Sequence, residues 1–158
     1  MQKVLFVILI LLLNTCRNFE DETKADFINY FENERAVFVK AGINAVTESN
    51  RALKLENKAA RKVLKKKVLP AYSEYIKALE NVKARTYPVI VLHQVFITAQ
   101  KIQHSALKLV YKYTASNDEK QIQKAQHFFE VSKSLIDWYD EEFKRLLRSF
   151  SIPVSLQP

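Results

Sequence analysis

The sequence contains one glycine, one cysteine and four prolines among its 158 residues. So little turn-forming material disfavours a β-sandwich or a βαβ fold, because both need frequent tight turns. The single cysteine, Cys16, excludes an internal disulfide and any zinc site built from several cysteines. The chain is nevertheless long enough to bury the core of one domain. Its abundance of Ala, Leu, Lys, Glu and Gln therefore predicts an all-α protein.

Acidic residues are scarce in two stretches of this basic chain, which has a net charge of +8. Residues 51–67 contain eight basic side chains and one acid, Glu56, and residues 81–117 contain no acid at all. On a helix, one side would carry the residues that we call the basic ridge: Lys54, Lys58, Arg61, Lys62, Lys65 and Lys66. Such a ridge either contacts phospholipid headgroups, an anionic envelope polymer or another envelope protein, or it is a solvated face. In the second case the acids of the last helix would partly balance it: Asp137, Asp140, Glu141 and Glu142.

The first sixteen residues read MQKVLFVILILLLNTC, with Lys3 before a ten-residue apolar run from Val4 to Leu13. A membrane span needs roughly 20 apolar residues, so this run fits the hydrophobic part of a secretory signal. Its end, Leu13-Asn14-Thr15-Cys16, resembles the lipobox of bacterial lipoproteins. The resemblance implies a signal peptide over 1–15, a lipidated Cys16 with a short tether over 16–22, and anchoring outside the cytoplasm at the outer membrane or cell surface. An uncleaved signal anchor, ordinary cleavage and an unmodified thiol are the alternatives.

Two long apolar stripes predict a helical hairpin in the second half of the chain. The first consists of Pro88, Leu92, Val95, Ala99, Ile102, Ala106, Leu109 and Tyr113. The second consists of Ile122, Ala125, Phe129, Ser132, Ile136, Tyr139, Phe143, Leu146 and Phe150. Between them, residues 114–119 form a predicted turn with Ser116 capping the last helix. Phe96, Ile97, Leu107 and Val110 widen the first stripe, so we expect that helix to be contacted from more than one side.

The first half of the chain predicts two further helices. The first would begin at Thr23, which has capping-box spacing with Asp26. Its apolar stripe is Ile28, Phe31, Phe38, Ala45 and Val46, interrupted by Arg35 and by Gly42, for which we favour close packing over a kink or a helix end. A turn over residues 47–50, with Ser49 as the cap, would lead into the second helix.

Pro70 should kink or split the second helix near Val68. The predicted architecture is an antiparallel four-helix up-down bundle over residues 23–150, or five helical segments if the helix splits. Residues 151–158, with two prolines, should form an extended tail.

No motif in the sequence indicates catalysis. It has no Gly-rich phosphate loop, no Gly-x-Ser-x-Gly, no Glu-x-x-His and no Cys-x-x-Cys-His. The histidines are His93, His104 and His127, and the first two fall outside the apolar stripe, so we expect them to face solvent. We therefore predict a non-enzymatic protein with no metal and no cofactor.

The tyrosines and Trp138 either line a ligand groove or form half-buried edges of the core, and we favour the second interpretation. The tyrosines in question are Tyr72, Tyr75, Tyr87, Tyr111, Tyr113 and Tyr139.

The order Leu69-Pro70-x-Tyr72-x-x-Tyr75-x-x-x-Leu79, followed by Leu92-His93 and Gln103-x-x-Ala106, resembles the helical body of small uncharacterised bacterial lipoproteins. That resemblance implies no chemistry. The expected function is that of an exported, membrane-anchored binding or interaction module of the bacterial envelope, held by membrane lipid through Cys16. A ligand- or cofactor-binding bundle and an envelope immunity or exclusion protein are the alternatives. Nucleic acid is not an expected partner, because an exported domain rarely meets it and the basic ridge lacks interleaved aromatics.

Overall fold

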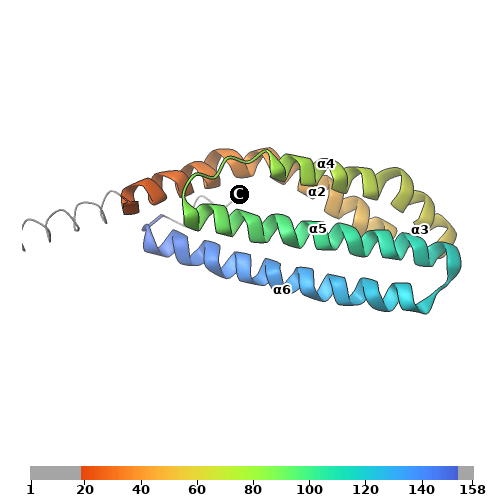
Figure 1. The fold of residues 1–158 in the computed structure, drawn as a ribbon. Helices are drawn as coiled ribbons and strands as arrows, with labels where there is room; N and C mark the ends of the chain where they lie inside the picture. Colours follow the sequence, from red (N-terminus) through yellow and green to blue (C-terminus); the bar gives the residue numbers. More distant parts are fainter. Residues whose placement is uncertain (1–18, 153–158) are drawn as a thin grey trace, which may run out of the picture.

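The computed structural model describes residues 19–152, and every regular element in that range is a helix. The helices form four segments, residues 19–52, 57–80, 87–116 and 119–149. Figure 1 shows these segments lying lengthwise beside one another. The all-α prediction is confirmed. The expected signal peptide, Cys16 and most of the C-terminal tail lie outside the described residues.

The last two segments, α5 (Tyr87–Ser116) and α6 (Glu119–Ser149), lie side by side and run in opposite directions (Figure 1). Their stripes meet where Ser132 Oγ donates a hydrogen bond to the Ala99 carbonyl oxygen at 3.0 Å. Asn117 adopts the left-handed conformation with φ 52°, which ends α5 and turns the chain. The cap of α6 is therefore Asp118, which accepts a hydrogen bond from the Lys120 amide, and the prediction of Ser116 as cap is wrong.

Helix α5 is buried on two faces, as its broad apolar surface predicts. One face packs against α6, and the other packs against α4 (Leu69–Glu80). The face toward α4 carries His93 and His104, which bond the Leu79 carbonyl and stack on Tyr72, respectively, and which are only 3 % and 7 % exposed. The prediction that these two histidines face solvent is wrong because it counted one buried face instead of two.

The first segment extends further in both directions than the sequence indicates. The helix reaches back at least to Phe19, so residues 19–22, the last part of the expected tether, are helical. Thr23 is buried and donates its hydroxyl to the Phe19 carbonyl, a mid-helix bond, and is therefore not a cap. The helix contains a π-helical turn of five residues, η1 (Tyr30–Glu34), and continues as α2 (Arg35–Ala52). The prediction of a turn over residues 47–50 with Ser49 as a helix cap is wrong. Ser49 is buried inside α2, and the chain turns at residues 53–56.

Gly42 of α2 packs closely against the second segment, as expected. A Cβ atom on residue 42 would lie 2.9 Å from Cζ of Tyr75 in α4. The absence of a side chain therefore lets α2 and α4 approach until the tyrosine ring rests on the glycine backbone.

The second segment is irregular just before Pro70, as predicted, but it does not split. It consists of α3 (Asn57–Val63), the π-helical turn η2 (Leu64–Val68) and α4. The Leu69 amide donates to the carbonyl five residues earlier, that of Leu64. Pro70 stands in the first turn of α4, where its missing donor is tolerated, so the wide turn lets the helix continue past it.

Candidate functional site

The basic ridge lies over three elements and not on one helical face. Lys54 is in the turn after α2, Lys58, Arg61 and Lys62 are on α3, and Lys65 and Lys66 are on η2. All except Arg61 are exposed. The predicted helical spacing is kept within α3 and is interrupted by the turn on one side and by the wider η2 on the other.

Arg61 is half-buried and fastens α3 to α5. Its guanidinium donates to the Tyr111 carbonyl oxygen at 3.2 Å and lies 4.4 Å from the centre of the Tyr111 ring. A cation held over an aromatic face and bonded to a carbonyl is oriented by both contacts. Arg61 therefore has a structural role, and the exposed lysines carry the charge that the ridge presents to solvent.

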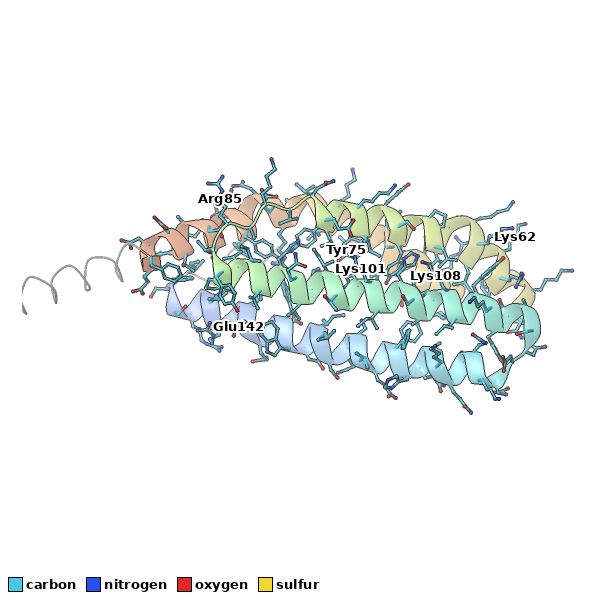
Figure 2. The ribbon with its side chains drawn as sticks, viewed as in Figure 1. Lys62, Tyr75, Arg85, Lys101, Lys108 and Glu142 are labelled. Atoms are coloured by element: carbon cyan, nitrogen blue, oxygen red, sulfur yellow. The ribbon has the colours of Figure 1, made fainter. Side chains whose placement is uncertain are left out.

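The basic ridge lies at the end of the molecule opposite to residue 19. At one end Asp26 Oδ2 accepts hydrogen bonds from Thr86, its amide at 2.7 Å and its hydroxyl at 2.8 Å. At the other end Arg61 contacts Tyr111. The helix between Thr86 and Tyr111 is about 38 Å long at 1.5 Å per residue. Figure 2 shows the same separation, with Lys62 and Arg85 at opposite ends.

The four acids of α6 that we expected to balance the basic ridge, Asp137, Asp140, Glu141 and Glu142, do not lie beside it. Since Ser132 bonds Ala99 and the two helices are antiparallel, Asp137 and Glu142 lie about 26 and 33 Å from Tyr111 along the bundle. Charges at such distances are screened, because the Debye length is about 10 Å at 0.1 M salt. Asp137, Glu141 and Glu142 instead form ion pairs within α6, with Lys133, Lys144 and Arg145, at 2.6 to 2.9 Å. Asp137, Glu141 and Glu142 therefore do not balance the charge of the basic ridge, contrary to expectation.

His93 belongs to a buried chain of hydrogen bonds. Its Nε2 lies 2.8 Å from the Leu79 carbonyl oxygen and must donate to it, which leaves Nδ1 as an acceptor. The Tyr30 hydroxyl donates to Nδ1 at 3.1 Å, and the Tyr139 hydroxyl then donates to Tyr30 at 3.3 Å. Burial lowers the pKa of His93 and raises the pKa values of Tyr30 and Tyr139, so all three are neutral at pH 7. Both ring nitrogens of His93 are thus engaged.

His104 is a second buried histidine. Its ring stacks on Tyr72 with centroids 5.9 Å apart, and its Nε2 has no hydrogen-bond partner among the described residues. Burial, and secondarily the charge of Lys108, lower the pKa of His104. Within residues 19–152, no three His, Cys, Asp or Glu side chains are grouped as a metal site would require.

A groove opens between α2 and α6, and we call it the α2/α6 groove. One part of it, of about 380 Å³, is lined by residues of four helices. These are Arg35, Phe38, Val39, Gly42, Ile43, Val46 and Thr47, with Tyr75 of α4, Phe96 of α5, and Tyr139 and Asp140 of α6. A second hollow of about 650 Å³ continues along Phe31, Glu32, Ala36 and Lys40 and shares Arg35, Val39 and Ile43 with the first.

The sequence identified only part of this groove. Tyr75 and Tyr139 were among the tyrosines considered, and both lie on its floor, 5 % and 6 % exposed. Tyr72 is fully buried, whereas Tyr87 and Trp138 are 74 % and 44 % exposed. The sequence shows Arg35 only as an interruption of the apolar stripe and does not assign it to a site. The signal that could have revealed it was a charged residue placed on the apolar stripe of the first helix.

Comparison with known proteins gives no relative. The chain matches no protein-family model, no curated protein and no solved structure. Of the helices in residues 19–152, none combines the length and the hydropathy that crossing a bilayer requires.

Proposed function

We propose that this chain is an exported, lipid-anchored and non-enzymatic interaction module of a bacterial envelope, and that its basic ridge binds an anionic envelope polymer. The observation that carries the proposal is the position of the ridge, about 38 Å along α5 from the Asp26–Thr86 contact. In this proposal the four helical segments form an up-and-down bundle that acts as a rigid spacer. One end is tied to the membrane and the other presents lysines.

The anchor in this proposal is Cys16, which lies three residues before Phe19. A diacyl chain gains about 0.8 kcal/mol per buried methylene, enough with two chains to hold the protein on a bilayer. The anchored end would then be the residue-19 end. Headgroups of the anchoring membrane would be more than three Debye lengths from the ridge, so an anionic polymer beyond that surface fits the geometry better.

Charge reversal on the ridge, with a charge-matched control, tests the polymer contact. The ridge variant is Lys58→Glu, Lys62→Glu and Lys66→Glu, and the control is Lys24→Glu, Lys77→Glu and Lys83→Glu, all at exposed positions. Each triple change lowers the formal net charge from +8 to +2. Binding is measured against soluble poly(glycerol phosphate) and, separately, against vesicles containing phosphatidylglycerol.

We expect the unmodified chain to bind the polymer at low salt and to release it as ionic strength rises. The ridge variant should bind at least about tenfold more weakly, and the control should keep most of its affinity. Equal losses in both variants would mean that only net charge matters. Binding to the vesicles but not to the polymer would replace the proposed partner with a membrane surface.

Incorporation of labelled palmitate tests the anchor. The unmodified chain should carry the label and sediment with membranes, whereas Cys16→Ser should lose both properties. An unlabelled wild-type chain in the soluble fraction would contradict anchoring without bearing on the ridge.

A further inference from the structure

We propose that the α2/α6 groove is a binding site for a monoanionic amphiphile, a long-chain carboxylate, with Arg35 binding the carboxylate and α2 holding the chain. This site is separate from the basic ridge. Phe96, on the groove floor, is about 22 Å from Tyr111 along α5. The proposal therefore does not depend on what the ridge binds.

The walls of the groove are apolar and remain open to solvent. Ile43 and Val46 line it one turn apart on α2 and are 63 % and 42 % exposed, so an alkyl chain could cover both. Phe31, which lines the groove, packs against Phe143 of α6 with ring centres 5.7 Å apart. Each of the two hollows, about 380 and 650 Å³, falls in the range of small-molecule sites. The groove thus has the shape and polarity that an alkyl chain needs.

Arg35 supplies a fixed cation within these apolar walls. Its guanidinium lies 5.7 Å from the centre of the Phe31 ring and 5.3 Å from that of Phe143. Within residues 19–152, it forms none of the ion pairs shorter than 4.0 Å. A guanidinium held against two rings is partly removed from water and keeps its planar fork, which matches a carboxylate.

The remaining charges favour one negative charge on the ligand and not two. The other charged residues that line the groove in the described structure are Glu32, Lys40 and Asp140. With Arg35 they sum to a formal charge of zero, so a dianionic headgroup would bring a large uncompensated charge into the groove. Tyr75 is a further polar group on the floor, and burial raises its pKa, so its hydroxyl remains protonated.

The chain offers a closely matched control for the test. Val37 and Ile43 both lie on α2 and are 62 % and 63 % exposed, but only Ile43 lines the groove. Val37→Glu and Ile43→Glu therefore make the same chemical change at equal exposure. Arg35→Gln removes the cation, and Arg35→Lys restores the charge without the planar fork.

The affinity of each variant is measured by calorimetry for dodecanoate and for 1-dodecanol, which has the same chain without the charge. The unmodified chain and Val37→Glu should prefer dodecanoate, and Ile43→Glu should lose both ligands. Arg35→Gln should weaken dodecanoate binding by about tenfold or more and leave 1-dodecanol unchanged, because one charge-assisted contact is lost. Arg35→Lys should recover part of the difference.

Three outcomes would overturn the proposal. Dodecanoate could bind Ile43→Glu as well as Val37→Glu, which would place the ligand elsewhere. Arg35→Gln could weaken acid and alcohol equally, which would make Arg35 a packing residue. Sedimentation could show an unmodified dimer that Ile43→Glu, but not Val37→Glu, converts to a monomer, which would make the groove a contact between two copies of the chain.

Discussion

Replacing Gly42 with alanine tests how closely α2 and α4 approach. A methyl group on residue 42 would lie 2.9, 3.0 and 3.1 Å from Cζ, Cε2 and the hydroxyl oxygen of Tyr75. The ring is buried and packs edge-on against Tyr72, with centroids 6.2 Å apart, so Tyr72 blocks its retreat on one side and only the side of the α2/α6 groove is open. Overpacking of this kind costs about 1–3 kcal/mol, whereas the better helix propensity of alanine returns about 1 kcal/mol. Gly42→Ala should therefore destabilise the fold by up to about 2 kcal/mol.

The sign of this effect should reverse when the ring is removed. In a Tyr75→Leu background the clash disappears, and Gly42→Ala should stabilise the helix by about 1 kcal/mol. Urea unfolding followed by far-ultraviolet circular dichroism measures both arms, and Ala36→Gly, at an exposed position of α2, calibrates helix propensity alone. If Gly42→Ala were equally stabilising with and without the tyrosine ring, the inferred close approach would be refuted.

Two further predictions concern buried polar groups. Asp26→Ala should destabilise the fold by about 3 kcal/mol, because Asp26 Oδ2 accepts three hydrogen bonds at the start of α5, two of them from Thr86. Urea unfolding measures this loss, with Asp21→Ala at an exposed position as the control. An equal loss of stability in both variants would contradict the role of Asp26. Burial lowers the pKa values of His93 and His104 in the folded chain, so the unfolded chain binds more protons below about pH 6.5. The free energy of unfolding should therefore fall as the pH decreases from about 6.5, by up to about 1.4 kcal/mol per pH unit for each histidine. Unfolding curves at several pH values check this, and an unchanged slope in the double glutamine variant would contradict it.

The hairpin was predictable because two long apolar stripes of helical spacing leave one arrangement that buries both. Ala99 and Ser132 are small residues at the middle of their stripes, and the structure brings them into hydrogen-bond contact. Their spacing in the sequence contains that information directly, since side chains three and four residues apart share a helix face.

Helix ends and the second face of α5 were not predictable in the same way. Thr23 and Ser116 have the spacing of capping residues, but a side chain with that spacing is also stable inside a helix when it bonds the carbonyl four residues earlier, and both do so. Local sequence therefore cannot distinguish a cap from a continuing helix. His93 and His104 are polar residues covered by α4, and their burial depends on a partner distant in the sequence.

The two departures from the apolar stripe of the first helix have a common explanation in the α2/α6 groove. The stripe runs through Phe31 and Phe38 to Ala45, and Arg35 and Gly42 replace the apolar side chains expected between them. In the structure both line the groove, one as its cation and the other as the gap that admits the Tyr75 ring to its floor. A leucine at either position would extend the stripe in the way that stability alone favours, and it would either remove the cation or displace the ring. Positions where local pattern and global packing disagree are where function is expected to be found, and here two such positions occur one above the other on the same surface.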